Sequence, residues 1–135
     1  MKKLLIALAA TTAMATAAQA EGELNIYNWV EYTSPEMIAK FEKETGIKVT
    51  IDTYDTNETL LAKLKAGGTG YDVVMPSQHF VEIMVKEDLL QDTGVGQMAN
   101  YKNLDPRWQK PSWDPEARYC APWQWGTASI AYRKD

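Results

Sequence analysis

The sequence predicts an α/β domain with a mainly parallel sheet flanked by helices. Segments with strand-like and helix-like patterns alternate along residues 24–87. Serine, asparagine, glycine and proline stand at the junctions, where such elements usually begin and end. Alternation of this kind favours parallel strands joined by right-handed crossovers, with the helices packed on the faces of the sheet.

The first strand is expected over residues 24–29 and the first helix over residues 35–45. Ser34 can cap that helix, and Pro35 suits its first position because proline has no amide hydrogen to leave unpaired there. Gly46 can end the helix in a left-handed conformation. The helix should bury the face that carries its apolar residues at helical spacing, which are Met37, Ile38 and Phe41.

The second strand is expected over residues 48–54. Alternation there predicts one buried face, formed by Val49, Ile51 and Thr53, and one exposed face that includes Tyr54. Asn57 can cap a second helix whose inner side carries three leucines, Leu60, Leu61 and Leu64. A short third strand should run over residues 72–75 and end at Pro76.

The remainder of the chain predicts one more helix and two more strands. The helix is expected over residues 79–87. Residues 91–116 are rich in Asp, Gly, Asn and Pro and should be mostly loop. The strands are expected over residues 118–123 and 127–132, with the tryptophans between and beside them in core or hinge packing.

The first twenty residues match a cleavable export signal. Lys2 and Lys3 precede an apolar run over residues 4–10, and residues 18–20 (Ala-Gln-Ala) are small in the positions that signal peptidase requires. The apolar run is too short to span a bilayer. We therefore expect residues 21–135 to act as a single lobe outside the cytoplasm.

Charge and cysteine content disfavour several classes of function. The chain has a formal net charge of −4, and loss of the two signal lysines makes the mature protein more acidic. An acidic chain disfavours nucleic acid and suits a cationic ligand. Cys120 is the only cysteine and His79 the only histidine, so the sequence predicts no internal disulfide and no metal site.

A carboxylate and two aromatic side chains follow the first expected strand. Trp29, Glu31 and Tyr32 offer what an organic cation needs, a negative partner for its charge and aromatic faces for its methylenes. On composition alone, Trp29 could equally be core and Glu31 an ordinary solvated charge. Ser77 could cap the next helix or contact a ligand, and His79 could be a surface residue at a helix start. Residues 29–32 and 76–79 both lie beyond the carboxyl ends of expected strands, where ligands of open parallel sheets bind.

Six segments occur in the order and spacing of a known family. They are residues 26–32 (Ile-Tyr-Asn-Trp-Val-Glu-Tyr), 41–49, 57–58, 71–77, 103–106 and 122–127. Together they resemble the spermidine/putrescine-binding periplasmic proteins of bacterial ABC transporters, over essentially the whole mature chain.

The resemblance implies a two-lobed, monomeric binding protein that closes around an extended polyamine and docks on a membrane permease. It implies no catalytic residues and no cofactor. Carried over by position, Trp29 is an aromatic wall, Glu31 pairs with a terminal ammonium and Tyr32 supports the pocket. Ser77 offers a hydroxyl at the end of the third strand, and His79 is a further pocket side chain.

The resemblance also implies a second lobe, so residues 21–135 are expected to be an incomplete N-terminal lobe that binds weakly alone. Val30 departs from the polar residue that is common at this place in the family, which leaves fine specificity open. Two alternatives remain. One is a binding protein for another small cation or an amino-acid-like solute. The other is an exported enzyme with Cys120 as nucleophile and Glu31 or His79 as base.

Overall fold

The computed structural model describes residues 22–67 and 70–134. Three parallel strands form one sheet with the order β2-β1-β3. The strands are β1 (Gly22–Trp29), β2 (Ile47–Tyr54) and β3 (Val73–Val74), and the helices are α1 (Pro35–Thr45), α2 (Asn57–Lys65) and α3 (Gln78–Lys86). The predicted α/β class is confirmed, whereas the predicted signal peptide lies outside the described residues.

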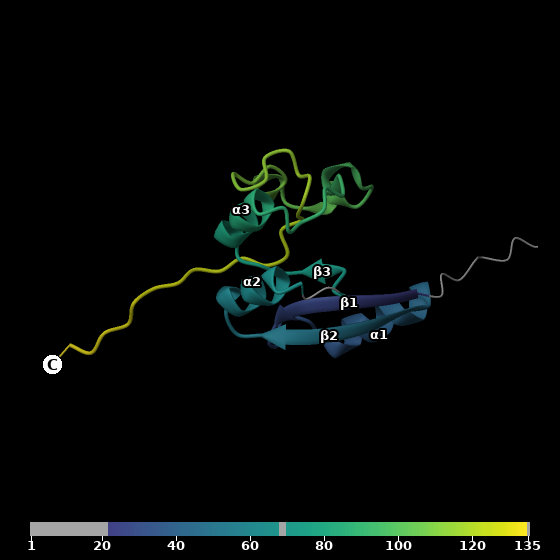
Figure 1. Ribbon diagram of the computed structural model, residues 1–135, viewed down its shortest axis with the longest axis horizontal. Helices are drawn as coiled ribbons and strands as arrows, with labels where there is room; N and C mark the ends of the chain where they lie inside the picture. Colours follow the sequence, from purple (N-terminus) through teal and green to yellow (C-terminus); the bar gives the residue numbers. More distant parts are fainter. Residues whose placement is uncertain (1–21, 68–69, 135) are drawn as a thin grey trace, which may run out of the picture.

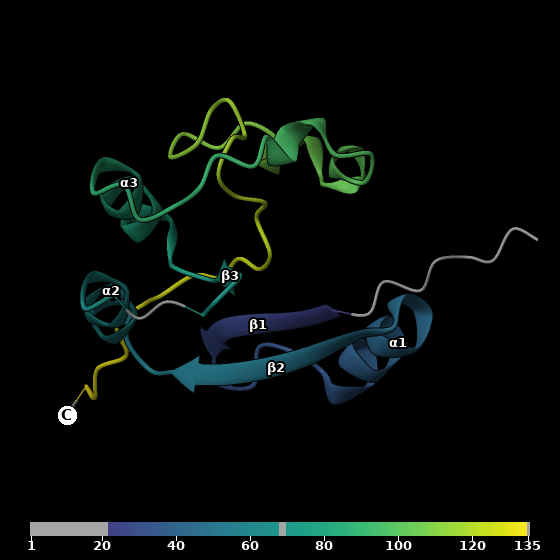
Figure 2. The ribbon, with the colours of Figure 1, turned by 45° about the vertical axis from the view of Figure 1, so that its right-hand side comes forward.

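The strand order distributes the helices over the sheet. Right-handed crossovers from β1 to β2, and from β2 across to β3, place α1 and α2 on opposite faces of the central strand β1. In Figure 2, α1 lies on the lower side of β1 and β2, and α2 and α3 lie beyond the arrowheads on the upper side. Both faces of this small sheet are therefore covered.

The core lies on the face of the sheet that meets α2 and α3. It consists of Tyr27 and Tyr54 from the strands together with Leu60, Phe80 and Met84 from the two helices. Leu60 and Met84 are completely buried. Each such side chain contributes about 1.5 to 3 kcal/mol through removal of apolar surface from water. The apolar side predicted for α2 is confirmed, and α3 buries Phe80, Val81 and Met84.

The predicted limits of α1 are confirmed together with the residues that set them. The Ser34 hydroxyl accepts a hydrogen bond from the Met37 amide at 3.2 Å. Gly46 has φ of 75° and donates its amide hydrogen to the Glu42 carbonyl at 2.8 Å. Glycine adopts this left-handed conformation without the steric cost that a Cβ atom brings.

Two predictions around the end of β2 are wrong. Tyr54 is buried rather than exposed, because this face of the sheet meets the layer formed by α2 and α3, while Thr53 is exposed. Asn57 does not cap α2. Thr56 does so, accepting a hydrogen bond from the Thr59 amide at 3.1 Å, and Asn57 is instead the first, buried residue of the helix.

The two strands predicted over residues 118–123 and 127–132 are absent from the described part of the chain. Residues 121–134 run without hydrogen-bonded strand partners past the sheet and away from the body of the molecule (Figure 1). Trp123 and Trp125 are 48% and 71% exposed, so their predicted core packing is also wrong. A strand-like pattern becomes a strand only where a neighbouring edge pairs with it.

Residues 91–116 are mostly loop, as predicted. They hold three short 3-10 helices, Val95–Gln97, Tyr101–Asn103 and Pro106–Trp108. None of the helices in the described ranges is long and apolar enough to cross a membrane.

Candidate functional site

The carboxyl ends of the three parallel strands meet at one edge of the sheet, which we call the carboxyl edge. It comprises residues 28–33 after β1, 54–57 after β2 and 75–79 after β3. All five side chains predicted to bind a ligand belong to this edge, because Trp29 ends β1 and His79 stands in the first turn of α3.

The turn after β1 is held from inside by Asn28. This side chain is completely buried, and its amide nitrogen donates to the Thr33 hydroxyl at 2.8 Å. Its amide oxygen accepts a hydrogen bond from the Trp29 amide at 2.7 Å. The Tyr32 amide closes the turn on the Trp29 carbonyl at 3.4 Å. The backbone that carries Glu31 is therefore fixed by its neighbours.

Glu31 adopts a left-handed backbone conformation with φ of 61°, and its side chain is exposed. A residue with a Cβ atom occupies this region at a cost of about 1 to 3 kcal/mol, and such residues cluster at ligand-binding sites. Among the described residues, no hydrogen bond or ion pair engages this carboxylate. The turn thus presents an unpaired negative charge at the carboxyl edge.

Trp29 is held in place by a carbonyl at the end of β3. Its indole nitrogen donates to the Met75 carbonyl at 2.9 Å, and the Tyr54 hydroxyl donates to the same oxygen. The Trp29 ring packs on Tyr54 with centroids 4.7 Å apart and lies 6.2 Å from the ring of Tyr32. Burial, reinforced by Tyr27 and Tyr32, raises the pKa of Tyr54 well above its usual range, so its hydroxyl stays a donor at any ordinary pH.

The Ser77 side chain does not cap α3 and is instead hydrogen-bonded to Asn57. Its hydroxyl makes no capping bond to that helix, although Ser77 occupies the capping position. Instead the hydroxyl accepts a hydrogen bond from the Asn57 side-chain amide at 3.0 Å, and the Ser77 backbone amide donates to the Asn57 side-chain oxygen at 2.9 Å. Sequence reasoning missed this role of Asn57, because the partner lies 20 residues away.

His79 is exposed and packs edge-on against Phe80, with ring centroids 4.8 Å apart. No hydrogen bond joins it to the other four predicted residues within the described part of the chain. The structure therefore brings Trp29 and Tyr32 into ring contact, and it places Glu31 in the turn between them. It leaves His79 as a separate residue at the start of α3.

A segment distant in sequence also reaches the carboxyl edge. The Gln124 side-chain amide and the Trp123 indole both donate to the Tyr32 carbonyl, at 3.2 Å and 3.4 Å. The family resemblance included residues 122–127 but assigned no site role to either residue. The only indication in the sequence was that Trp123 and Gln124 are neighbours and that both side chains can donate hydrogen bonds.

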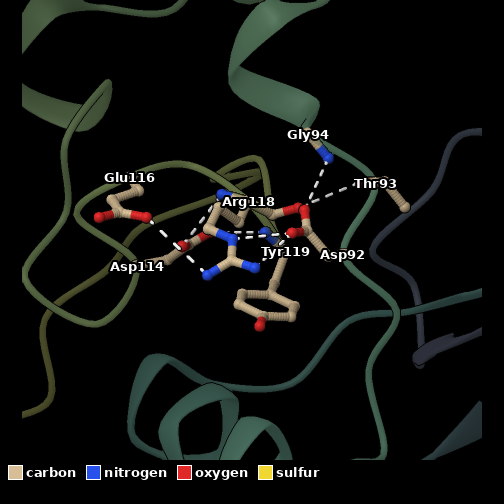
Figure 3. Close-up of polar contacts among 7 residues, drawn as sticks. All are labelled: Asp92, Thr93, Gly94, Asp114, Glu116, Arg118 and Tyr119. Carbon is tan, nitrogen blue, oxygen red and sulfur yellow. Dashed lines mark hydrogen bonds and ion pairs between the residues drawn. The ribbon is translucent and has the colours of Figure 1, made fainter.

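Cys120 belongs to the loop region around Asp114, part of which is shown in Figure 3. Asp114 is buried and accepts hydrogen bonds from the backbone amides of Arg118 and Tyr119, at 3.1 and 2.9 Å (Figure 3). It also accepts one from the Cys120 amide at 3.0 Å. The Arg118 guanidinium also pairs with Asp92 at 2.6 Å. These contacts close the loop region on itself.

The setting of Cys120 does not suit a nucleophile. Burial, with the Asp114 carboxylate beside it, raises the pKa of the thiol to about 11, so little thiolate exists at neutral pH. In the described ranges, no hydrogen bond joins Cys120 to Glu31 or His79. Nowhere in residues 22–67 and 70–134 do three or more His, Cys, Asp or Glu side chains form a group that could hold a metal ion.

Two hollows in the described part of the chain are lined by residues other than the predicted ligand-binding ones. One, of about 300 Å³, lies between α2, β3 and the chain after α3, and residues such as Leu64, Tyr71 and Leu89 line it. The other, of about 190 Å³, is a shallow depression beside Trp113 and Arg118.

Comparison with known proteins shows one consistent likeness. The family model described as bacterial extracellular solute-binding protein matches residues 28–135. The chain is 41% identical to the putrescine-binding periplasmic protein PotF of Escherichia coli, over 99% of the chain and 38% of that protein. It is 42% identical to the putrescine-binding periplasmic protein SpuD of Pseudomonas aeruginosa, over 98% of the chain and 37% of that protein.

Solved structures show the same likeness. The spermidine/putrescine ABC transporter substrate-binding protein PotD of Streptococcus pneumoniae matches 72% of the chain with a TM-score of 0.67 and 38% identity, over 30% of that protein. The TpPotD lipoprotein of Treponema pallidum matches 76% of the chain with a TM-score of 0.70 and 35% identity, over 32% of that protein. The chain thus spans about a third of the length of these proteins.

The hydrogen bond from Tyr54 to the Met75 carbonyl should make the Tyr54 hydroxyl more important for stability than the Tyr71 hydroxyl. Tyr54→Phe removes a buried hydrogen bond and should lower the free energy of unfolding by about 1 kcal/mol in urea titration. Tyr71→Phe is the matched control, because its hydroxyl donates to Asp52 at an exposed position and should cost clearly less. Equal losses for the two variants would show that the Met75 carbonyl is no special anchor.

The Cys120 thiol should react slowly with iodoacetamide. At pH 8 we expect folded protein to be alkylated at less than about a tenth of the rate of the urea-unfolded protein, whose thiol has an ordinary pKa of about 8.5. The rate in the folded protein should keep rising with pH toward about 11. A rate that levels off below pH 8 would indicate an activated thiol and revive the enzyme alternative.

Proposed function

Since this chain belongs to the bacterial extracellular solute-binding protein family, we propose that it forms one wall of a polyamine site in the substrate-binding component of an ABC importer. Its ligand would be putrescine, spermidine or a related amine, captured reversibly and passed to a membrane permease. The names of PotF and SpuD as putrescine-binding proteins support this choice. The predicted periplasmic location is confirmed at the level of the family, whose members here are named periplasmic proteins.

One observation carries the proposal, the unpaired carboxylate of Glu31 beside two aromatic rings. Glu31 is exposed in a strained turn, and Trp29 and Tyr32 flank it in sequence with their rings 6.2 Å apart. A primary ammonium ion satisfies such a carboxylate with charge-assisted hydrogen bonds. The methylenes next to it gain from contact with an aromatic face. A neutral solute lacks the charge that pairs with this carboxylate, and an anionic solute is repelled by it.

The interaction free energies support the view that Trp29, Glu31 and Tyr32 form only part of a binding site. One charge-assisted hydrogen bond contributes about 1.5 to 3 kcal/mol, and one cation–π contact about 0.5 to 2 kcal/mol. A micromolar dissociation constant requires about 8 kcal/mol. The contacts available from Trp29, Glu31 and Tyr32 therefore correspond to millimolar binding, and tighter binding needs groups from a second lobe that closes over the ligand.

Ser77 and His79 have secondary places in this proposal. Ser77 retains hydrogen-bonding capacity after its contacts with Asn57 and can accept from an amine. His79 is exposed at the same edge, in the first turn of α3, and is a further candidate contact for the ligand. Binding of an amino-acid-like solute is the competing proposal, and a ligand that carries a carboxylate separates the two.

The proposal is tested by following the indole resonances of ¹⁵N-labelled protein during titration with 1,4-diaminobutane. We expect a saturable shift of the Trp29 indole signal in the millimolar range or below, and no such shift with 1-butanol or γ-aminobutyrate. Glu31→Gln should weaken binding by at least about tenfold, the effect of one charge-assisted hydrogen bond.

Glu23→Gln is the matched control for Glu31→Gln. It makes the same change of charge at the opposite, amino-terminal end of β1, where the side chain is also exposed. This variant should bind the diamine like the unmodified protein. Equal weakening by both substitutions would reduce the effect to overall charge, and a Trp29 signal that does not respond to the diamine at all would contradict the proposed site.

A further inference from the structure

Asn57 devotes its whole side chain to Ser77. The residue is buried, its amide nitrogen donates to the Ser77 hydroxyl at 3.0 Å, and its oxygen accepts from the Ser77 amide at 2.9 Å. These two bonds join the first residue of α2 to the residue before α3. They connect the segments that follow β2 and β3 at the carboxyl edge.

Helix formation does not explain this pair. Thr56 already caps α2 through its contact with the Thr59 amide. Ser77 makes no side-chain capping bond to α3, although it stands at the capping position of that helix. A serine released from Asn57 would be free to cap α3 in the usual way. The pair therefore holds the Ser77 hydroxyl away from its common local role.

The chemistry of the pair also fixes the direction of the hydroxyl. The Ser77 backbone amide can only donate, so the atom of Asn57 that faces it must be the oxygen. The nitrogen of Asn57 then faces the Ser77 hydroxyl and must donate to it. The hydroxyl oxygen keeps its own hydrogen and one lone pair for other partners. Ser77 is partly exposed at the carboxyl edge, and its hydroxyl still has the capacity to accept a hydrogen bond from a ligand.

We infer that Asn57 is a positioning residue of the amine site, acting through Ser77, whose oriented hydroxyl accepts a hydrogen bond from the bound ammonium group. This inference rests on the proposed function. Asn57 itself does not touch the ligand. Its effect on affinity must therefore pass through Ser77 and disappear when the Ser77 hydroxyl is absent.

A double-mutant cycle in diamine affinity tests the inference. Asn57→Ala should weaken binding of 1,4-diaminobutane about three- to tenfold, the factor that corresponds to the loss of one ordinary hydrogen bond. In protein that already carries Ser77→Ala, the same substitution should change the affinity less than about twofold. Residues that act independently would instead give the same loss in both backgrounds.

Thr56→Ala is the matched control for a merely structural effect. It removes the cap of α2 one residue away and lowers stability, but it leaves the contact between Asn57 and Ser77 intact. We expect its diamine affinity to equal that of the unmodified protein. Weakening of the same size as in Asn57→Ala would overturn the inference, because general destabilisation would then account for both.

A second measurement uses the unmodified protein and does not depend on a variant that folds. The side-chain ¹⁵N amide signal of Asn57 should shift along the same saturation curve as the Trp29 indole signal. No movement of that signal at saturation would overturn the inference. Absence of diamine binding by the unmodified protein would overturn the proposed function, whereas diamine binding that Asn57→Ala leaves intact would overturn this inference alone.

Discussion

The Met75 carbonyl is the point on which the candidate site depends. It accepts hydrogen bonds from the Trp29 indole and the Tyr54 hydroxyl, and so it joins the ends of all three strands. Strand β3 has only two residues and little pairing of its own to hold it. Because this carbonyl also precedes Pro76 and Ser77, the same contacts set where the chain enters α3. These contacts therefore help to fix the position of Ser77 relative to the Trp29 ring.

Much of the fold could be predicted because its determinants are local. The capping serine and the left-handed glycine of α1 act on neighbouring residues, and both do so as predicted. Prediction failed where the deciding partner is distant. Tyr54 is buried because a second layer covers that face, and residues 127–132 form no strand because no edge pairs with them in the described part of the chain. An alternating pattern of side chains reveals neither the layer that covers Tyr54 nor the lack of a strand partner for residues 127–132 within the described ranges.

The site was predictable in its place but not in its construction. Residue type and family resemblance located Trp29, Glu31, Tyr32, Ser77 and His79 at the carboxyl edge, yet their ligand contacts stay predictions. The supports of this edge were not predictable. Sequence reasoning assigns Asn57 to a helix cap and gives Asn28 no role, whereas both are buried and pair with specific partners. Such pairing follows from packing in three dimensions.

Intermolecular nuclear Overhauser effects test the central claim most directly, since they report which protein protons lie within about 5 Å of a bound ligand. With 1,4-diaminobutane, the account predicts cross-peaks from the ligand methylenes to the Trp29 and Tyr32 rings, and their loss when Gln replaces Glu31. Cross-peaks confined to other aromatic residues such as Trp108 or Trp113, or cross-peaks to Trp29 that persist without the carboxylate, would contradict it.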